Sequence, residues 1–320
     1  MVPTSLPKYT KVEKMPRIEL DELSKLWNFT PSEKFVHDFS LLNLDFNVLS
    51  QVERDEAVLK VLRALDSDLV TVGAHRAGDW EKGWGENFEN YKQSKNLTDV
   101  IPKYFNKIPL VRWKQEWVEP VNPTLEYDLL GLIVEYITET YLLEKETIYE
   151  FGCGTGHNLL RIRKRIPNAK LVGLDWASSS QELIREIALS TSDSNLFAEN
   201  FNYFEPNTKL EIEEGSAVLT VASLEQTGSD FKDFIEYIAL QKPSVVVHIE
   251  PMWEPLDSEN LLDYLSIKYF EKRKYLNGLQ RYIESLENAG RAQIINKQRT
   301  GIGSFFIDGY SILVWKPTAS

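Results

Sequence analysis

The chain has few of the residues that build disulfides or metal sites. Its 320 residues include one cysteine, Cys153, and four histidines. A single cysteine excludes an intramolecular disulfide, and no set of cysteines and histidines has the spacing of a zinc site. We therefore expect a cytoplasmic protein, in a reducing compartment, with no metal ion in its site.

Long apolar runs are also absent. No stretch of the sequence approaches the roughly 20 apolar residues that a membrane-spanning helix requires. Residues 1–20 mix proline, lysine, arginine and glutamate, without the apolar segment of a signal peptide. We expect neither a leader sequence nor a membrane partner.

Positive charge is in deficit, because 36 lysines and arginines stand against 48 aspartates and glutamates, for a net charge of −12. Proteins that bind nucleic acids neutralise phosphates with lysine and arginine. A small-molecule partner is therefore expected, and no nucleic acid. With 42% hydrophobic and 26% charged residues, the composition is that of a globular protein with one large domain or two smaller ones.

The second half of the chain alternates apolar, β-branched runs with helical patterns. After an expected helix at 124–142, the candidate strands are 147–151, 170–175, 195–201, 217–223 and 244–250, with helical patterns at 158–166, 179–190 and 231–240. Such alternation indicates a mostly parallel sheet that is covered on both faces. A long helical stretch at 258–288 precedes two further candidate strands, 291–296 and 310–315, which we expect to pair antiparallel at the sheet edge.

The first half has a different character. Apolar residues between Val48 and Leu65 follow helical spacing, and a β-like run occupies 69–72. Residues 73–87 combine glycines, two tryptophans and ionisable side chains, and we interpret them as a loop that either contacts a substrate or braces the core. Prolines between 102 and 123 indicate a linker. We therefore divide the chain into a mainly helical extension, 1–123, and a domain, 124–320.

The strongest motif follows the first strand of that domain. Glu150 precedes three alternating glycines, Gly152, Gly154 and Gly156, just before a predicted helix. Glycines allow a sharp turn and a close approach of the backbone to a ligand, and the helix start offers free N–H groups. A dinucleotide-binding fingerprint would require glycine at the position of His157.

This segment resembles the Glu/Asp-x-Gly-x-Gly-x-Gly motif of class I S-adenosylmethionine-dependent methyltransferases. The resemblance implies a Rossmann-like fold, an α/β doubly wound and mostly parallel seven-stranded sheet, with S-adenosyl-L-methionine as the cofactor. Glu150 and the three glycines would then hold the methionine part. An NAD-linked oxidoreductase on a Rossmann fold and a non-catalytic methyltransferase-like binding protein remain alternatives.

The ends of the later strands supply further cofactor candidates. Asp175 ends the second strand, about 20 residues after the glycine loop, where an acid binds ribose hydroxyls. Trp176 would cover the ribose or adenine, or pack in the core. The resemblance places Asn200 and Phe201 at the adenine edge and Ser223 beside the cofactor.

The acceptor side rests on the remaining ionisable and aromatic residues. The segment that contains Glu225 and Gln226 resembles one in which relatives carry histidine, so Gln226 removes one common base. The candidate bases are then His248, Glu250 and His75, although His248 and Glu250 also suit a core residue and a loop cap. Candidate substrate-binding residues are Trp84, Glu225, Gln226, Glu254 and Arg273. The expected reaction is methyl transfer to a polar small molecule, for example a sugar or nucleotide-linked sugar.

Overall fold

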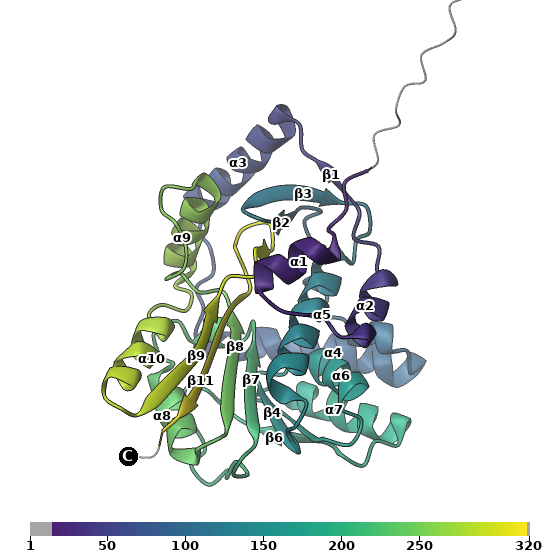
Figure 1. Ribbon diagram of the computed structural model, residues 1–320, viewed down its shortest axis with the longest axis vertical. Helices are drawn as coiled ribbons and strands as arrows, with labels where there is room; N and C mark the ends of the chain where they lie inside the picture. The colour runs from purple at the N-terminus through teal and green to yellow at the C-terminus, as the bar shows by residue number, and fades with distance from the viewer. Residues whose placement is uncertain (1–14, 319–320) are drawn as a thin grey trace, which may run out of the picture.

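A seven-stranded sheet forms the centre of the molecule in the computed structural model, which describes residues 15–318 (Figure 1). The strand order is β6–β5–β4–β7–β8–β11–β9. Its strands are β4 (Thr147–Phe151), β5 (Lys170–Asp175), β6 (Leu196–Asn200), β7 (Ala217–Val221), β8 (Val245–Glu250), β9 (Ala292–Gln298) and β11 (Ser311–Pro317). Neighbours from β6 to β8 are parallel, and β11 is antiparallel to both β8 and β9. The predicted strands and their edge pair are confirmed.

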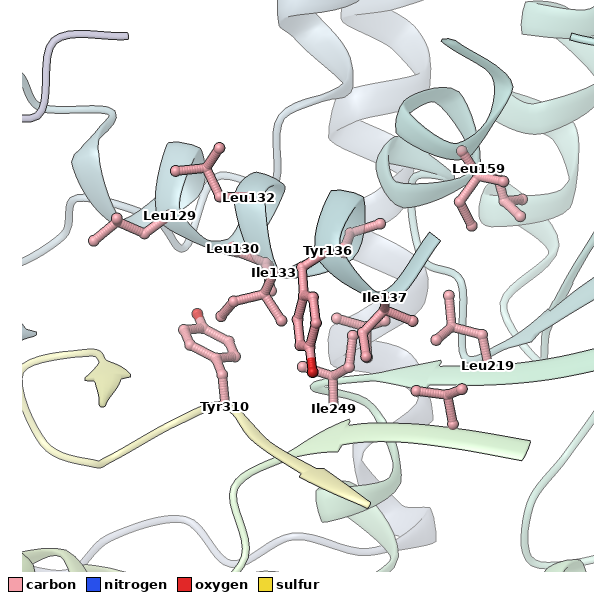
Figure 2. Close-up of a cluster of buried hydrophobic side chains, with 14 of the residues drawn as sticks. Leu129, Leu130, Leu132, Ile133, Tyr136, Ile137, Leu159, Leu219, Ile249 and Tyr310 are labelled. Carbon is pink, nitrogen blue, oxygen red and sulfur yellow. The ribbon is translucent and has the colours of Figure 1, made fainter. Parts of the chain in front are cut away.

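Helices cover both faces of this sheet, as a doubly wound fold requires. The helices α5 (Leu125–Ile137), α6 (His157–Arg165) and α7 (Ser178–Thr191) lie on one side, and α8 (Lys232–Gln241) and α10 (Leu279–Asn288) on the other (Figure 1). Side chains alternate along each strand, so Ile148 joins the first layer and Tyr149 the second. Figure 2 shows Ile133 and Ile137 of α5 directed toward Ile249 of β8. Burial of these faces stabilises the fold by about 25 cal/mol per Å² of apolar surface.

The first half contributes more than helices. Its elements are α1 (Leu20–Trp27), α2 (Glu33–Ser40), β1 (Phe46–Val48), α3 (Gln51–Asp66), η1 (Ala74–Arg76), α4 (Ala77–Ser94), η2 (Leu97–Val100), β2 (Val111–Trp113) and β3 (Glu116–Pro120). These three strands and β10 (Ile302–Gly303) form an antiparallel sheet in the order β1–β3–β2–β10, in which β10 pairs with β2. This small sheet was not predicted, because strands of two to five residues leave almost no alternation to detect.

Residues 73–87 are not a loop, which corrects the prediction for this segment. They form η1 and the first part of α4, even though each glycine disfavours a helix by about 1 kcal/mol relative to alanine. Contacts with α7 account for the helix. The Glu81 carboxylate accepts hydrogen bonds from the backbone N–H groups of Ser178 (2.8 Å) and Ser179 (3.0 Å) at the start of α7. A tertiary partner therefore overrides the local propensity.

Two further expectations about local structure are wrong. Residues 69–72 form no strand; instead the Val72 N–H donates a single hydrogen bond to the carbonyl of Arg273. The stretch 258–288 is broken into α9 (Leu261–Arg273) and α10, because Lys274 adopts a left-handed conformation with φ of 55°. The break places Arg273 at the carboxyl end of α9.

The two halves share one hydrophobic core. Ile18 and Trp27 of the first half belong to the same buried cluster as Leu129 and Ile312 of the second. The Trp27 indole donates a hydrogen bond to the carbonyl of Thr300 (3.1 Å). The division between residues 123 and 124 stays a prediction about domain organisation. Within residues 15–318, none of the helices combines the length and apolar character that crossing a bilayer would require.

Candidate functional site

The loop between β4 and α6 favours glycine at three positions. Gly152, Gly154 and Gly156 have φ values of 65°, 52° and 76°, in the left-handed region that glycine adopts most readily. A Cβ atom on Gly152 would lie 2.5 Å from the Ser223 side chain, and one on Gly154 would lie 2.9 Å from the Trp84 ring. The loop therefore presents bare backbone toward the neighbouring space.

Asp175 ends β5 beside this loop. Its carboxylate accepts hydrogen bonds from the backbone N–H groups of Gly154 and Ala177, both at 2.9 Å. Burial raises the pKa of Asp175 to about 6, against the opposing effect of these two hydrogen bonds. Each oxygen keeps a lone pair for one more donor, so the carboxylate is able to accept from two hydroxyl groups at once.

A cavity opens over the loop and Asp175, with about 700 Å³ of empty space that includes open solvent, and we call it the smaller cavity. Of the predicted cofactor residues, Gly152, Gly154, Asp175, Trp176, Phe201 and Ser223 line it, as does the predicted substrate residue Trp84. The rings of Trp176 and Phe204 stack with centroids 5.7 Å apart beside Asp175. Trp80, of the segment 73–87, lines the cavity as well. So do Tyr104, His157, Tyr203 and Phe204, which no sequence motif identified as ligand-contacting residues.

Two predicted cofactor residues lie behind this wall. Glu150 is 1% exposed, and one of its oxygens accepts from the Asn158 side chain at 2.9 Å while the other is buried with no partner among the described residues. Burial raises the pKa of Glu150 to about 8. Gly156 begins α6 and packs on Ile184. Both residues support the loop from behind the wall. Asn158, which donates to Glu150, itself lines the cavity.

The structure does not place Asn200 at the cavity, which corrects that prediction. Asn200 is exposed, and its side-chain amide donates to the carbonyl of Trp176 at 3.3 Å. The N–H of Phe201 is also engaged, with the carbonyl of Asp175 at 3.2 Å. Of the two residues predicted to lie at the adenine edge, only Phe201 lines the cavity.

Glu250 anchors a loop instead of facing an acceptor. It is fully buried, and its carboxylate accepts from the backbone N–H groups of Ser223 (3.1 Å), Leu224 (3.1 Å) and Glu225 (3.3 Å). Burial and the neighbouring Glu225 raise the pKa of Glu250 well above its ordinary value. The structure agrees with the alternative in which Glu250 caps the loop and is not a base.

The two histidine candidates and Glu254 line neither the smaller cavity nor the larger one described below. His248 is fully buried, its Nδ1 is 2.9 Å from the Thr220 hydroxyl, and its Nε2 accepts from the Trp315 indole at 3.0 Å. Burial lowers the pKa of His248 to about 3, so it is a core residue and not a base. His75 is exposed in η1, away from the described cavities.

A second cavity adjoins the first, with about 1620 Å³ of empty space that includes open solvent, and we call it the larger cavity. The two share the walls formed by Trp80, Trp84, Tyr104, Ala222 and Gln226. The predicted substrate residues Trp84, Glu225, Gln226 and Arg273 all line it, and four residues that the sequence did not single out for a role, Arg76, Glu126, Tyr275 and Tyr310, line it as well. A ligand in one cavity would therefore lie next to a ligand in the other.

Glu126 is one of the carboxyl groups that line this cavity. It stands in the first turn of α5, and the Tyr310 hydroxyl donates a hydrogen bond to it at 2.9 Å. Burial raises the pKa of Glu126 to about 7, and the hydrogen bond from Tyr310 limits the rise. Figure 2 shows Tyr310 beside α5. No local sequence signal joins these two residues, which are 184 positions apart.

No family model matches the chain, and no curated protein matches it. Among solved structures, the chain is similar to the pyocyanin biosynthetic protein PhzM (TM-score 0.48, 12% identity, 83% of this chain and 70% of that chain). It is also similar to human N-acetylserotonin methyltransferase in complex with S-adenosylmethionine (TM-score 0.46, 13% identity, 84% and 68%).

Geranyl diphosphate methyltransferase gives a TM-score of 0.44 at 12% identity, over 63% of this chain and 93% of that chain. A chain from Nostoc punctiforme, described as a candidate O-methyltransferase, has a TM-score of 0.41 at 15% identity. The match covers 61% of this chain. It spans 57% of the Nostoc chain, which is less than two thirds of that chain's length.

Proposed function

We propose that this protein is an S-adenosylmethionine-dependent methyltransferase that acts on a small molecule. The observation that carries the proposal is the pair of adjoining cavities, one over a bare glycine loop with Asp175 at its side, the other lined by ionisable and aromatic groups. When bound, the cofactor would supply a methyl group on a positively charged sulfur. The acceptor nucleophile would bond to the methyl carbon in line, and the sulfur would leave as S-adenosylhomocysteine.

The residues around the smaller cavity fit this cofactor. The Asp175 carboxylate would accept hydrogen bonds from the ribose hydroxyls, and the stacked Trp176 and Phe204 rings offer an apolar surface for a flat base. Side chains on Gly152 or Gly154 would collide with Ser223 or Trp84, and both glycines line the cavity with no side chain of their own. These features support S-adenosylmethionine binding by Gly152, Gly154 and Asp175, with Glu150 and Gly156 supporting the loop from behind the wall.

The position of His157 disfavours the oxidoreductase alternative. A dinucleotide fold has glycine at this position so that the helix can pack closely on the strand. Here the His157 ring is 93% buried, with its centroid 6.4 Å from that of Phe105 and 5.8 Å from that of Tyr127. Burial lowers the pKa of His157 well below its ordinary value, so the ring brings no positive charge for a phosphate.

Glu126 is the proposed general base in place of the three sequence candidates. A carboxyl group with a pKa of about 7 is divided between its two protonation states near neutral pH and can take a proton from a hydroxyl or amine as the methyl group arrives. Tyr310 would hold the carboxylate in place. A sugar or nucleotide-linked sugar stays within this proposal, since Trp80 and Trp84 stack at 5.4 Å and offer a surface for a ring.

Calorimetric titration with S-adenosylhomocysteine and with NADH tests the proposal. We expect S-adenosylhomocysteine to bind and NADH not to bind. NADH binding without S-adenosylhomocysteine binding would favour the oxidoreductase. Formation of S-adenosylhomocysteine from S-adenosylmethionine in the presence of an acceptor panel separates an enzyme from a binding protein.

A further inference from the structure

We propose that the larger cavity binds an anionic acceptor, whose carboxylate or phosphate group is held by the guanidinium of Arg273. This inference rests on the methyltransferase function proposed above and names the class of its acceptor. The cavity also receives side chains from both halves of the chain, including Arg76 and Tyr104 from the first half. A ligand that enters it therefore meets groups that the cofactor half alone does not provide.

Aromatic rings, and no carboxylate, hold Arg273 in place. Its guanidinium lies 5.2 Å from the centroid of the Tyr275 ring and 5.9 Å from that of Tyr269, and one terminal nitrogen donates weakly to the Tyr269 hydroxyl (3.4 Å). Its Nε is buried with no partner, and none of the described carboxylates lies within 4.0 Å of it. Because a guanidinium offers five N–H donors in a planar fork, most of its capacity remains for a ligand.

The charges along the cavity leave an excess of positive groups. Two of its acids are paired within the protein, Asp79 with Arg76 (3.1 Å) and Glu86 with Lys103 (3.2 Å). The other two acids, Glu126 and Glu225, have pKa values raised by burial, which disfavours their negative forms.

The cations of the larger cavity with no ion pair among the described residues are Arg273, Lys82 and Lys107. These three unpaired cations line one cavity of a chain with a net charge of −12. They would attract an anion into an otherwise repelling molecule.

The proposed base, Glu126, and the proposed anion site, Arg273, line the same cavity and are linked through Glu225 and Tyr310. Burial raises the pKa of Glu225, and the nearby charge of Arg273 opposes part of this rise; Tyr275 and Tyr310 also lie near Glu225. Tyr310 in turn is bonded to Glu126. An acceptor with an anionic group at Arg273 and a nucleophile near Glu126 would therefore span the cavity past Glu225. A neutral analogue would leave the guanidinium charge of Arg273 without a counter-charge, which disfavours its binding.

The test uses the full chain saturated with S-adenosylhomocysteine and three ring probes of matched shape: 4-hydroxybenzoate, 4-hydroxyphenyl phosphate and neutral 4-hydroxybenzamide. Tryptophan fluorescence reports binding, since Trp80 and Trp84 line the cavity. We expect at least one anion to bind about tenfold or more tightly than the amide, the effect of one charged hydrogen bond. The variant Arg273→Gln removes this preference, and Arg273→Lys retains part of it.

Lys272→Gln is the matched control, because it removes the same charge from the adjacent, exposed residue, which does not line the cavity. It should keep the preference for the anion. Equal binding of anion and amide, no binding of either anion, or the same loss in Lys272→Gln overturns the inference. Binding of only one anion supports it and identifies the group as a carboxylate or a phosphate.

Titration of S-adenosylhomocysteine alone separates the two proposals. Arg273→Gln should bind it as the wild type does, since Arg273 does not line the smaller cavity. If the wild type fails to bind S-adenosylhomocysteine, the proposed function itself is wrong. If it binds S-adenosylhomocysteine but shows no preference for an anion, only the acceptor class is wrong.

Discussion

Single carboxylates in this protein have roles that depend on what surrounds them. Glu250 is enclosed by backbone N–H donors and holds a loop, whereas Glu126 faces a cavity with one tyrosine as its partner. Asp175 combines both situations, with one backbone bond on each oxygen and an open side toward the smaller cavity. Residue type alone therefore does not separate a base from an anchor.

Replacement of Asp175 by alanine should weaken S-adenosylhomocysteine binding by roughly 10- to 150-fold. The basis is the net loss of about one charged hydrogen bond, worth roughly 1.5 to 3 kcal/mol. Calorimetric titration measures the change. Glu199→Ala, at an exposed position on the adjacent strand, is the control and should bind normally. A change below about twofold in Asp175→Ala would show that this carboxylate does not contact the ligand.

The pH dependence of turnover should reveal Glu126. Because burial raises its pKa to about 7, this carboxyl is mostly protonated at pH 6 and mostly ionised at pH 8. A base works only in the ionised form, so the rate should rise through pH 7 and level off above it.

The variant Glu126→Gln should lose most turnover, together with this dependence, and still bind S-adenosylhomocysteine. Tyr310→Phe removes the hydrogen bond that limits the rise, so the midpoint should move to higher pH. A profile that is the same in the wild type and in Glu126→Gln would argue for a different base.

At the scale of elements, the helix α4 closes the glycine loop from above. Trp84 of α4 lies so near Gly154 that a Cβ there would come within 2.9 Å of its ring. The same helix supplies Glu81 to the start of α7. The helix α4 is thus bonded to α7, the helix that follows Asp175. The close approach of α4 to the glycine loop requires glycine at position 154.

Gly154→Val should abolish S-adenosylhomocysteine binding, because a branched side chain at φ of 52° would strain the loop and displace Trp84. Gly78→Ala in α4 is the control, since a Cβ there has no atom within 4 Å. It should keep binding and stabilise the fold by about 0.5 to 1 kcal/mol through helix propensity. Titration and thermal unfolding measure both effects. Normal binding in a folded Gly154→Val variant would contradict the proposed contact.

The whole molecule is held by a core that extends across both halves of the sequence. Trp27 is 1% exposed, stacks on Tyr136 of α5 with centroids 5.5 Å apart and donates to Thr300 near the end of the chain. The strand β10 of the second half completes the small sheet of the first. These links make independent unfolding of the first half unfavourable.

Trp27→Ala should lower the free energy of unfolding by roughly 3 to 5 kcal/mol, the usual cost of deleting a buried aromatic ring. Unfolding in urea, followed by circular dichroism and by fluorescence, should remain one transition at which both signals coincide. Leu240→Ala, at a position that is 74% exposed, should change little. Two separate transitions in the wild type would show that the halves unfold independently.

The sequence by itself determined the central sheet, the glycine loop and Asp175. These features are encoded locally: apolar runs of period two, helical spacing between them, and glycines flanked by a strand and a helix. The strands expected at 147–151 and 170–175 have the same bounds in the structure. An acid at the end of the second strand was identifiable because its position follows from the order of elements alone.

The tertiary structure alone decided which polar residues face a ligand. The sequence offered His248, Glu250 and Asn200, but buried partners occupy the first two and solvent surrounds the third. Glu126 and Tyr310 meet across 184 positions, and α4 is a helix because it packs on α7. Burial and pairing between distant segments set the pKa values and the exposure of these groups, and no short stretch of sequence contains that information.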